Sequence, residues 1–336
     1  MIYYPTLKKD FTIGVTAPSS GIDPEFHYYI DEIKKRFERD HKLIIGDTVY
    51  TQKKAKSADA LIRAYELNTF LTSDEIGIVI PPWGGDLAIE ILDKLNFQDF
   101  KPKWMLGYSD TSLILLALTL KTGIATAHGT NIVDLRGKFS DETTKRWIDI
   151  LWMSKGDSIE QVSSKMYQSE WSHDNSTGYV FNFDRETEWK TVSGNFESFE
   201  GRLLGGCIDV IHHLVGTPYG NVEYFRNHFI NNEPVIWYLE NCESSPVDVR
   251  RMLVQMHFAG WFKNCSGIMF GRTSVSFDVD GYTMTDVYHD IAKDLGIPVI
   301  YDFDCGHMPP QITLVNGAYA KVQCANGKGS ITQTFI

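Results

Sequence analysis

The first half of the chain alternates short apolar runs with longer stretches in which apolar residues recur at helical spacing. We interpret the runs as buried strands and the longer stretches as helices. The predicted strands are Phe11–Ala17, Leu43–Ile45, Ile76–Ile80, the run ending at Tyr108, and Ile124–His128. The predicted helices cover residues 24–37, 58–71, 87–95, 110–123 and 141–153. Strands joined through helices, without hairpin signals, predict a parallel sheet covered on both faces, with ligands bound beyond the carboxyl ends of its strands.

The second half of the chain has a different pattern, richer in strands. Strands are predicted at 234–240, 267–271 and 297–301, helices at 247–262 and 284–295, and Asn316-Gly317 and Asn326-Gly327 are hairpin turn signals. Residues 154–190 between the halves show no sustained period, which is typical of a linker or lid. We therefore predict an α/β protein with a parallel-sheet domain at 1–160, a linker or lid at 161–190, and a β-rich domain with helices at 191–336.

Ser109 lies at the corner between a predicted strand and a predicted helix, in the stretch Gly107-Tyr-Ser-Asp110. A serine on such a corner projects its hydroxyl away from the backbone and lies at the positive end of the following helix. This indicates a nucleophile, although Thr111 stands where the standard G-x-S-x-G elbow has glycine. A helix N-cap is the alternative, because serine is a preferred capping residue.

The pair Gly84-Gly85 follows another predicted strand. Its backbone can approach a ligand closely and offer N–H groups to an oxyanion, and the alternative is a plain tight turn. No G-x-G-x-x-G or G-x-x-x-x-G-K-[ST] pattern is present, which disfavours a nucleotide cofactor.

Glu240 and His307 also lie at strand ends beside turn residues, so the chain order is nucleophile, acid, base. Taken alone, Glu240 is typical of a surface or ion-pair carboxylate and His307 of a structural histidine. Their combination with Ser109 indicates a catalytic triad. Glu243 is the rival acid.

Composition narrows the choice of partners and location. A net charge of −11 argues against a nucleic-acid partner, which would favour clustered Lys and Arg. The five cysteines are widely spaced and include no C-x-x-C pair, so no disulfide framework, metal site or cofactor is expected. No apolar run of about 18 residues spans a membrane, and the N-terminus lacks a signal-peptide layout, so we expect a cytoplasmic protein without a membrane partner.

The segments around Ser109, Glu240 and His307, with Thr16-Ala-Pro-Ser-Ser20, Gly84-Gly85 and Gly201 to Gly206, resemble the serine peptidase family of the LD-carboxypeptidases and microcin C self-immunity peptidases. The resemblance covers nearly the whole chain. It implies a flavodoxin-like N-terminal domain, a β-rich C-terminal domain, a homodimer, and a site between the domains.

The resemblance also implies roles for individual residues. Ser109 is then the nucleophile, His307 the general base and Glu240 the residue that orients His307. The backbone N–H of Asp110 and one from Gly84 or Gly85 form the oxyanion hole.

Departures from the family pattern affect the expected substrate. Trp83 stands where many relatives have Arg, Cys207 where many have Asn, and Asn241 where many carboxypeptidase-like members have Asp. Trp171 and Trp189 either face substrate or anchor the linker. We expect Trp83 and Trp171 to bind a flat substrate, which places the chain closer to the microcin-immunity branch.

The first hypothesis is thus a serine peptidase that cuts small peptides or peptidyl or aminoacyl nucleotides. The alternatives are a murein LD-carboxypeptidase that releases terminal D-Ala, a non-catalytic small-ligand binding protein, and a nucleotide-using α/β enzyme, which the missing glycine fingerprints oppose.

Overall fold

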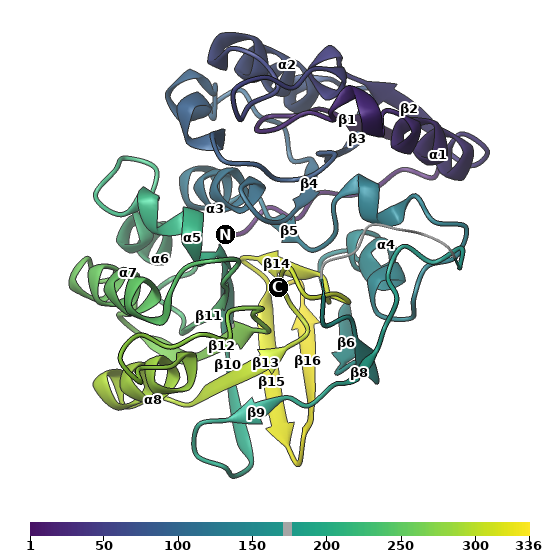
Figure 1. The fold of residues 1–336 in the computed structure, drawn as a ribbon. Coiled ribbons are helices and arrows are strands. Elements are labelled where there is room, and N and C mark those ends of the chain that lie inside the picture. The colour runs from purple at the N-terminus through teal and green to yellow at the C-terminus, as the bar shows by residue number, and fades with distance from the viewer. Residues whose placement is uncertain (171–176) are drawn as a thin grey trace.

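A computed structural model of the chain, which describes residues 1–170 and 177–336, contains two large sheets stacked one above the other (Figure 1). The first is a six-stranded sheet in the order β14-β5-β4-β3-β1-β2. Strands β1 to β5 run parallel, and β14 pairs antiparallel with β5 at one edge. The bounds are β1 Thr12–Val15, β2 Lys42–Ile45, β3 Ile76–Ile80, β4 Trp104–Gly107, β5 Thr126–His128 and β14 Leu314–Asn316.

The second sheet has eight strands in the order β6-β16-β15-β10-β11-β12-β13-β9. Its centre, from β10 to β13, is parallel, and the flanking pairs are antiparallel. The bounds are β6 Ser158–Val162, β9 Lys190–Thr191, β10 Glu197–Cys207, β11 Val235–Glu240, β12 Cys265–Gly271, β13 Val299–Phe303, β15 Tyr319–Ala325 and β16 Lys328–Thr334. A separate hairpin pairs β7 (Met166–Tyr167) with β8 (Arg185–Glu186).

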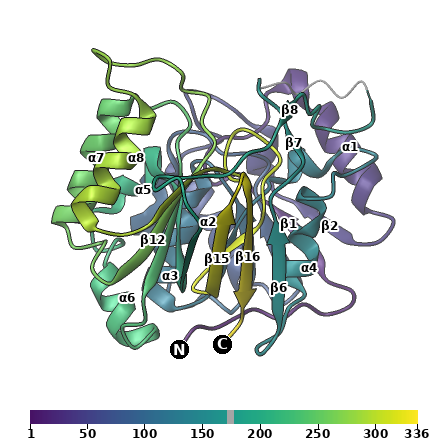
Figure 2. The same ribbon diagram turned by 90° about the horizontal axis from the view of Figure 1, so that it is seen from below.

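Helices connect the parallel strands in both halves. The α-helices are α1 Tyr28–Phe37, α2 Ala60–Thr72, α3 Thr111–Thr122, α4 Trp147–Leu151, α5 Ile208–Ile211, α6 Val222–Phe229, α7 Pro246–Phe258 and α8 Met284–Leu295. The 3-10 helices are η1 Pro24–Phe26, η2 Asp47–Tyr50, η3 Ala88–Lys94, η4 Ile132–Leu135, η5 Thr144–Arg146 and η6 His212–Leu214. Seen from below, α7 and α8 lie together on one side of the second sheet (Figure 2).

Helix α3 lies between the two sheets and contacts β4, β5 and β10 (Figure 1). Every residue from Thr111 to Leu120 is buried. A helix that is apolar all round must be covered on all sides, so the two sheets enclose it. Because α3 begins directly after Ser109, this enclosure fixes Ser109 relative to both sheets.

The predicted fold class is confirmed, and α8 has the predicted bounds. Two helix predictions were wrong in kind or length. Residues 87–95 form the 3-10 helix η3, whose last turn is closed by an i→i−3 bond from Leu95 N to Leu92 O. Residues 141–153 contain only η5 and the five-residue α4, because Asp141 accepts the N–H groups of Thr143 and Thr144 and makes a capped turn first.

The segment 154–190 contains more regular structure than its sequence pattern predicts, since it includes β6, β7 and β8. Strand β6 was missed because its inward-facing residue, Gln161, is polar. The Gln161 amide is buried and bonds both backbone groups of Thr313. Residues 171–176, with Trp171, lie outside the described part of the chain.

One of the two predicted hairpins is present. Asn326-Gly327 joins β15 to β16, whereas Asn316-Gly317 joins β14 to β15, which belong to different sheets. The Asn316 side chain is buried, and its Oδ1 accepts bonds from Tyr238 Oη and Gly205 N while its Nδ2 donates to Thr126 Oγ1. This turn therefore ties the two sheets together. The predicted domain boundaries stay predictions.

No helix in residues 1–170 and 177–336 is long and apolar enough to cross a membrane.

A fully buried carboxylate, Asp304, anchors the segment that follows β13. It accepts bonds from Ser164 N at 2.8 Å, Ser164 Oγ at 2.6 Å, Trp189 Nε1 at 2.8 Å and Arg272 Nη2 at 2.7 Å. Trp189 is itself 1% exposed, so it anchors the linker and does not face a substrate.

We expect Asp304→Asn to lower the free energy of unfolding by about 3–5 kcal/mol, because it leaves the buried guanidinium of Arg272 without its carboxylate. Asp302→Asn is the matched control. Asp302 forms its ion pair with the partly exposed Lys190, so its loss should cost less than about 1 kcal/mol. Urea denaturation of both variants measures the difference, and equal losses would contradict the anchoring by Asp304.

Candidate active site

Ser109 lies between the end of β4 and the start of α3 with a backbone φ of +61°. This left-handed conformation is costly for a residue other than glycine and persists only where the surroundings enforce it. The first turn of the helix does so, since Ser112 N donates to Ser109 O at 2.8 Å. The backbone therefore has the strained strand-to-helix corner of a nucleophile elbow.

The turn after β3 covers Ser109 closely. A Cβ placed on Gly84 would lie 2.5 Å from Ser109 Cβ, 2.6 Å from its Oγ and 3.0 Å from Asp110 N. Only glycine permits this approach. The backbone of Gly84 and the N–H of Asp110 thus border the same space beside the serine hydroxyl, whereas Gly85 packs against Ser19 and Ser20.

His307 and Glu240 reach Ser109 from the second sheet. Glu240 ends β11, and His307 follows β13 by a short loop. The Nε2 of His307 lies 3.0 Å from Ser109 Oγ, and its Nδ1 lies 2.8 Å from Glu240 Oε2. The structure therefore brings together the three residues that the sequence singled out, 198 and 67 positions apart along the chain.

A glycine makes the contact between His307 and Glu240 possible. Gly306 has a φ of +96°, and a Cβ there would lie 2.7 Å from both Cβ and Oε2 of Glu240. The backbone before His307 therefore lies against the side of the Glu240 carboxylate. A larger residue at position 306 would push His307 away from its partner.

The environment of His307 favours the protonated ring. Burial by itself lowers the pKa of His307, but the carboxylate of Glu240 and the neighbouring Cys242 more than offset it, so the pKa lies well above its ordinary value. Glu240 is 1% exposed and its side chain is fully buried, so its charge acts on the ring with little screening by water.

The side chain of Asp110 has a structural function that sequence reasoning missed. It is buried, and its Oδ2 accepts bonds from Ser19 Oγ at 2.5 Å and Ala88 N at 2.7 Å. Asp110 therefore holds the turns after β1 and β3 against the start of α3. The hydroxyl-rich stretch Pro18-Ser-Ser20 was the signal that could have indicated it.

Asp209 organises the loop that follows Glu240. Its carboxylate accepts bonds from Cys242 N at 2.9 Å, Ser244 N at 3.1 Å and Ser244 Oγ at 2.6 Å. Its Oδ2 also lies 3.3 Å from Cys207 Sγ. The rival acid Glu243 is carried to the surface by this loop, where it is exposed.

A pocket of about 250 Å³ is lined by Gly84 and Tyr108, which adjoin Ser109, whereas Ser109, Glu240 and His307 do not line it themselves. The half-buried Trp83 lines it, and its Nε1 donates to Gly21 O at 2.8 Å, which fixes the indole ring. The other lining residues are Ser20, Gly21, Asp23, Gln52, Gly84, Gly85, Tyr108, Val133 and Asp134. Trp171, the second predicted substrate-binding residue, lies outside the described residues.

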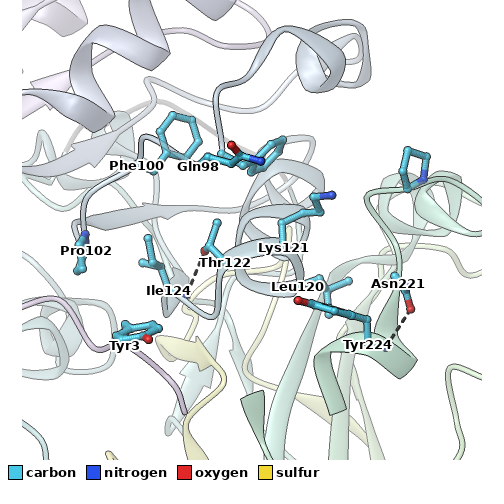
Figure 3. Close-up of a pocket in the computed structure, with 12 residues that line it drawn as sticks. Tyr3, Gln98, Phe100, Pro102, Leu120, Lys121, Thr122, Ile124, Asn221 and Tyr224 are labelled. Carbon is cyan, nitrogen blue, oxygen red and sulfur yellow. Dashed lines mark hydrogen bonds between the residues drawn. The ribbon is translucent and has the colours of Figure 1, made fainter. Parts of the chain in front are cut away.

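A larger pocket of about 530 Å³ contains none of the predicted site residues. It lies at the other end of α3, where Lys121, Thr122 and Tyr224 border it (Figure 3). The length of α3, at about 1.5 Å per residue, separates it from Ser109 by roughly 18 Å. Of these two pockets, the smaller one is therefore the one that adjoins Ser109, through Gly84 and Tyr108.

Comparisons with known proteins identify the class of the molecule. Residues 13–129 match the LD-carboxypeptidase N-terminal domain and residues 200–322 match the LD-carboxypeptidase C-terminal domain. These two matches and the fold define a serine carboxypeptidase-type hydrolase. The chain belongs to the LD-carboxypeptidase family, and the resemblance noted from its sequence is confirmed.

Individual relatives are distant but align over most of the chain. The Microcin C7 self-immunity protein MccF of Escherichia coli is 24% identical over 88% of this chain and 85% of its own length. A probable murein peptide carboxypeptidase of Bacillus subtilis is 22% identical over 95% of this chain and 91% of its own. The solved structure of MccF in complex with aspartyl sulfamoyl adenosine superposes with a TM-score of 0.80 at 21% identity, covering 100% of this chain and 99% of that one.

We expect the reaction of Ser109 with a fluorophosphonate probe to slow on the acid side, because only the neutral ring of His307 can accept the serine proton. Since the pKa of His307 is raised, the midpoint should lie above the reference value of roughly 6.5. Labelling rates measured across buffers of equal ionic strength give this midpoint. A rate that stays constant well below the reference value would contradict a histidine base.

Proposed function

We propose that the chain is a serine peptidase in which Ser109 attacks an amide carbonyl, with an aminoacyl or peptidyl nucleotide as its substrate. The observation that supports this most directly is the unbroken chain of contacts from Ser109 Oγ to His307 Nε2 at 3.0 Å and from His307 Nδ1 to Glu240 Oε2 at 2.8 Å. A serine, a histidine and a carboxylate in this order perform nucleophilic catalysis on unrelated folds.

The proposed reaction has two steps. In the first, His307 Nε2 accepts the Ser109 proton while Oγ bonds to the carbonyl carbon, and the same proton then passes to the leaving nitrogen. In the second, His307 accepts a proton from water as the water oxygen bonds to the acyl carbon, the bond between that carbon and Ser109 Oγ breaks, and the proton passes from His307 back to Oγ. Glu240 accepts the Nδ1–H bond throughout, which keeps Nε2 free to accept and stabilises the charged ring.

The oxyanion of each step would lie in the space between Gly84 and Asp110. The positive end of α3 and the Asp110 N–H point there, and the close approach of Gly84 supports a second donor from the Gly84-Gly85 turn. The Asp110 side chain is engaged with Ser19 and Ala88, so it holds this arrangement in place.

The pocket beside Ser109 favours a substrate with a flat base over a peptide that ends in a carboxylate. A murein peptide ends in a carboxylate near the scissile bond, which calls for a cation. Among residues 1–170 and 177–336, however, those that line the pocket include Asp23 and Asp134 and no Lys or Arg. The fixed indole of Trp83 instead offers a face to a base, and base–aromatic stacking contributes roughly 1–3 kcal/mol. The complex of MccF with aspartyl sulfamoyl adenosine is consistent with such a ligand in this fold.

The homodimer and the cytoplasmic location also stay predictions. Sedimentation velocity of the purified chain would measure its oligomeric state.

Glu240→Gln should lower turnover by roughly 10⁴ while the fold persists, because the amide no longer fixes the tautomer of His307. The matched control is Glu243→Gln, an exposed glutamate on the following loop, which should stay within about twofold of the parent. Steady-state rates and thermal unfolding of both variants decide the matter. A larger loss in Glu243→Gln would make Glu243 the acid.

Aspartyl sulfamoyl adenosine should be hydrolysed, while a murein tetrapeptide should be cut weakly or not at all. Ser109→Ala is the control for both substrates and should lose on the order of 10⁴- to 10⁶-fold in rate. Trp83→Ala should raise KM for the nucleotide about 5- to 150-fold, the equivalent of the stacking energy. Efficient release of D-Ala, with no cleavage of the nucleotide, would establish the murein LD-carboxypeptidase alternative instead.

A further inference from the structure

Three side chains of different chemistry converge behind the Ser109–His307 contact. The Sγ of Cys207, a carboxylate oxygen of Glu240 and a ring nitrogen of His307 all lie within 4.8 Å of one another. They come from the end of β10, the end of β11 and the loop after β13. Thiolate, imidazole and carboxylate are the three ligand types that Zn²⁺ binds in proteins.

An independent observation indicates that one carboxylate oxygen of Glu240 is free to bind a ligand. Its Oε2 faces His307, but its Oε1 is buried and has no hydrogen-bond partner among the described residues. The whole Glu240 side chain is shielded from solvent. An unpaired carboxylate oxygen in such a place is costly, and a bound cation would satisfy it.

The surroundings of Cys207 are those of a thiol that a metal can convert to a thiolate. The residue is 2% exposed, and burial together with Glu240 and Asp209 raises the pKa of the thiol well above its ordinary value. A coordinated metal supplies the positive charge that these carboxylates favour, and a thiol bound to it loses its proton.

We propose that Cys207, Glu240 and His307 form an inhibitory Zn²⁺ site, in which the metal occupies the position between His307 Nδ1 and the Glu240 carboxylate. Zinc–ligand bonds of roughly 2.0–2.3 Å place tetrahedral ligands about 3.5 Å apart, so His307 Nδ1 and Glu240 Oε2, which are 2.8 Å apart, must separate by about 0.7 Å, and Cys207 Sγ must come within about 3.5 Å of both. Rotation of the Cys207 side chain supplies a movement of this size.

Binding rearranges the protons of the site. The S–H bond of Cys207 breaks as its sulfur bonds to Zn²⁺, and that proton passes to solvent. The Nδ1 proton of His307 must also leave: from the neutral ring it moves to Nε2, and from the protonated ring, whose Nε2 already carries a proton, it passes to solvent. In both cases Nε2 keeps a proton. Nε2 can then no longer accept the proton of Ser109, so the metal inhibits without contacting the serine. This inhibition rests on the proposed function, whereas the binding of the metal does not.

Metal binding can be tested with Co²⁺, whose absorption spectrum reports on its ligands. The test uses the Ser109→Ala variant, so that catalytic turnover does not affect the result. Titration under a non-thiol reductant should give a sulfur-to-cobalt charge-transfer absorption that saturates and is displaced by Zn²⁺. Adding Cys207→Ser should abolish it. Cys324→Ser, a comparably buried cysteine on β15, is the matched control and should leave it unchanged. An absorption that persists in Cys207→Ser, or is lost only in Cys242→Ser, would overturn the proposal.

Activity provides the second measurement. Zn²⁺ should inhibit the parent enzyme, and EDTA should restore its activity. Half-inhibition of Cys207→Ser, measured relative to the metal-free rate of that variant, should need at least about tenfold more Zn²⁺. The neighbouring rings of His212 and His213, 3.9 Å apart, are the competing surface site. Inhibition that is unchanged in Cys207→Ser, or that disappears in a His212→Gln/His213→Gln variant, would refute the site. If no substrate is turned over, the proposed function fails, and the cobalt spectrum still decides the metal site.

Discussion

The contact between Ser109 Oγ and His307 Nε2 joins two sheets that, apart from β6 and β14, are built from opposite halves of the chain. Its 3.0 Å length depends on how those sheets are held. Neither sheet contains a complete site. The buried helix α3 fixes their separation, and Asn316 ties β14 and β5 of one sheet to β10 and β11 of the other. Because a misplacement of about 1 Å can cost roughly 10² in rate, the core between the sheets is as much a requirement of the site as its side chains are.

The enclosure of the site between the two sheets also gives the two histidines near Glu240 different pKa values. His128 is fully buried, and this lowers its pKa to about 4, despite the opposing influence of Glu240. His307 forms a direct hydrogen bond with this carboxylate, so its pKa is raised. His128 therefore stays neutral and packs between Tyr108 and Tyr238, while His307 is the imidazole that we propose gains and loses a proton. Environments that push two titratable groups apart in this way assign their roles.

The sequence was sufficient for the fold class and for the residues at strand ends, because period and turn chemistry are local properties. It could not predict β6, whose inward residue is the polar Gln161, or the 3-10 form of η3, whose first N–H is held by Asp110 from another segment. The turn at Asn316-Gly317 has a hairpin composition, yet tertiary bonds of the Asn316 side chain direct its two strands into different sheets. Each of these misses arises where a side chain makes its decisive contact far along the chain.

Sequence motifs that rely on residue spacing fail for the same reason when the residues of a site come from distant segments of the chain. Cys207, Glu240 and His307 show no metal-binding pattern in the sequence, and only the parallel ends of β10 and β11 and the loop after β13 bring them together. Trp83 and Cys207, two of the three positions that are expected to depart from the family pattern, lie in different parts of the site. Trp83 borders the pocket, and Cys207 lies beside Glu240 and His307. Neither is needed to hold Ser109 against His307. Substitutions at these positions can therefore change what the site binds while the geometry of the three central residues is kept, which is how one fold can accommodate different substrates within a family.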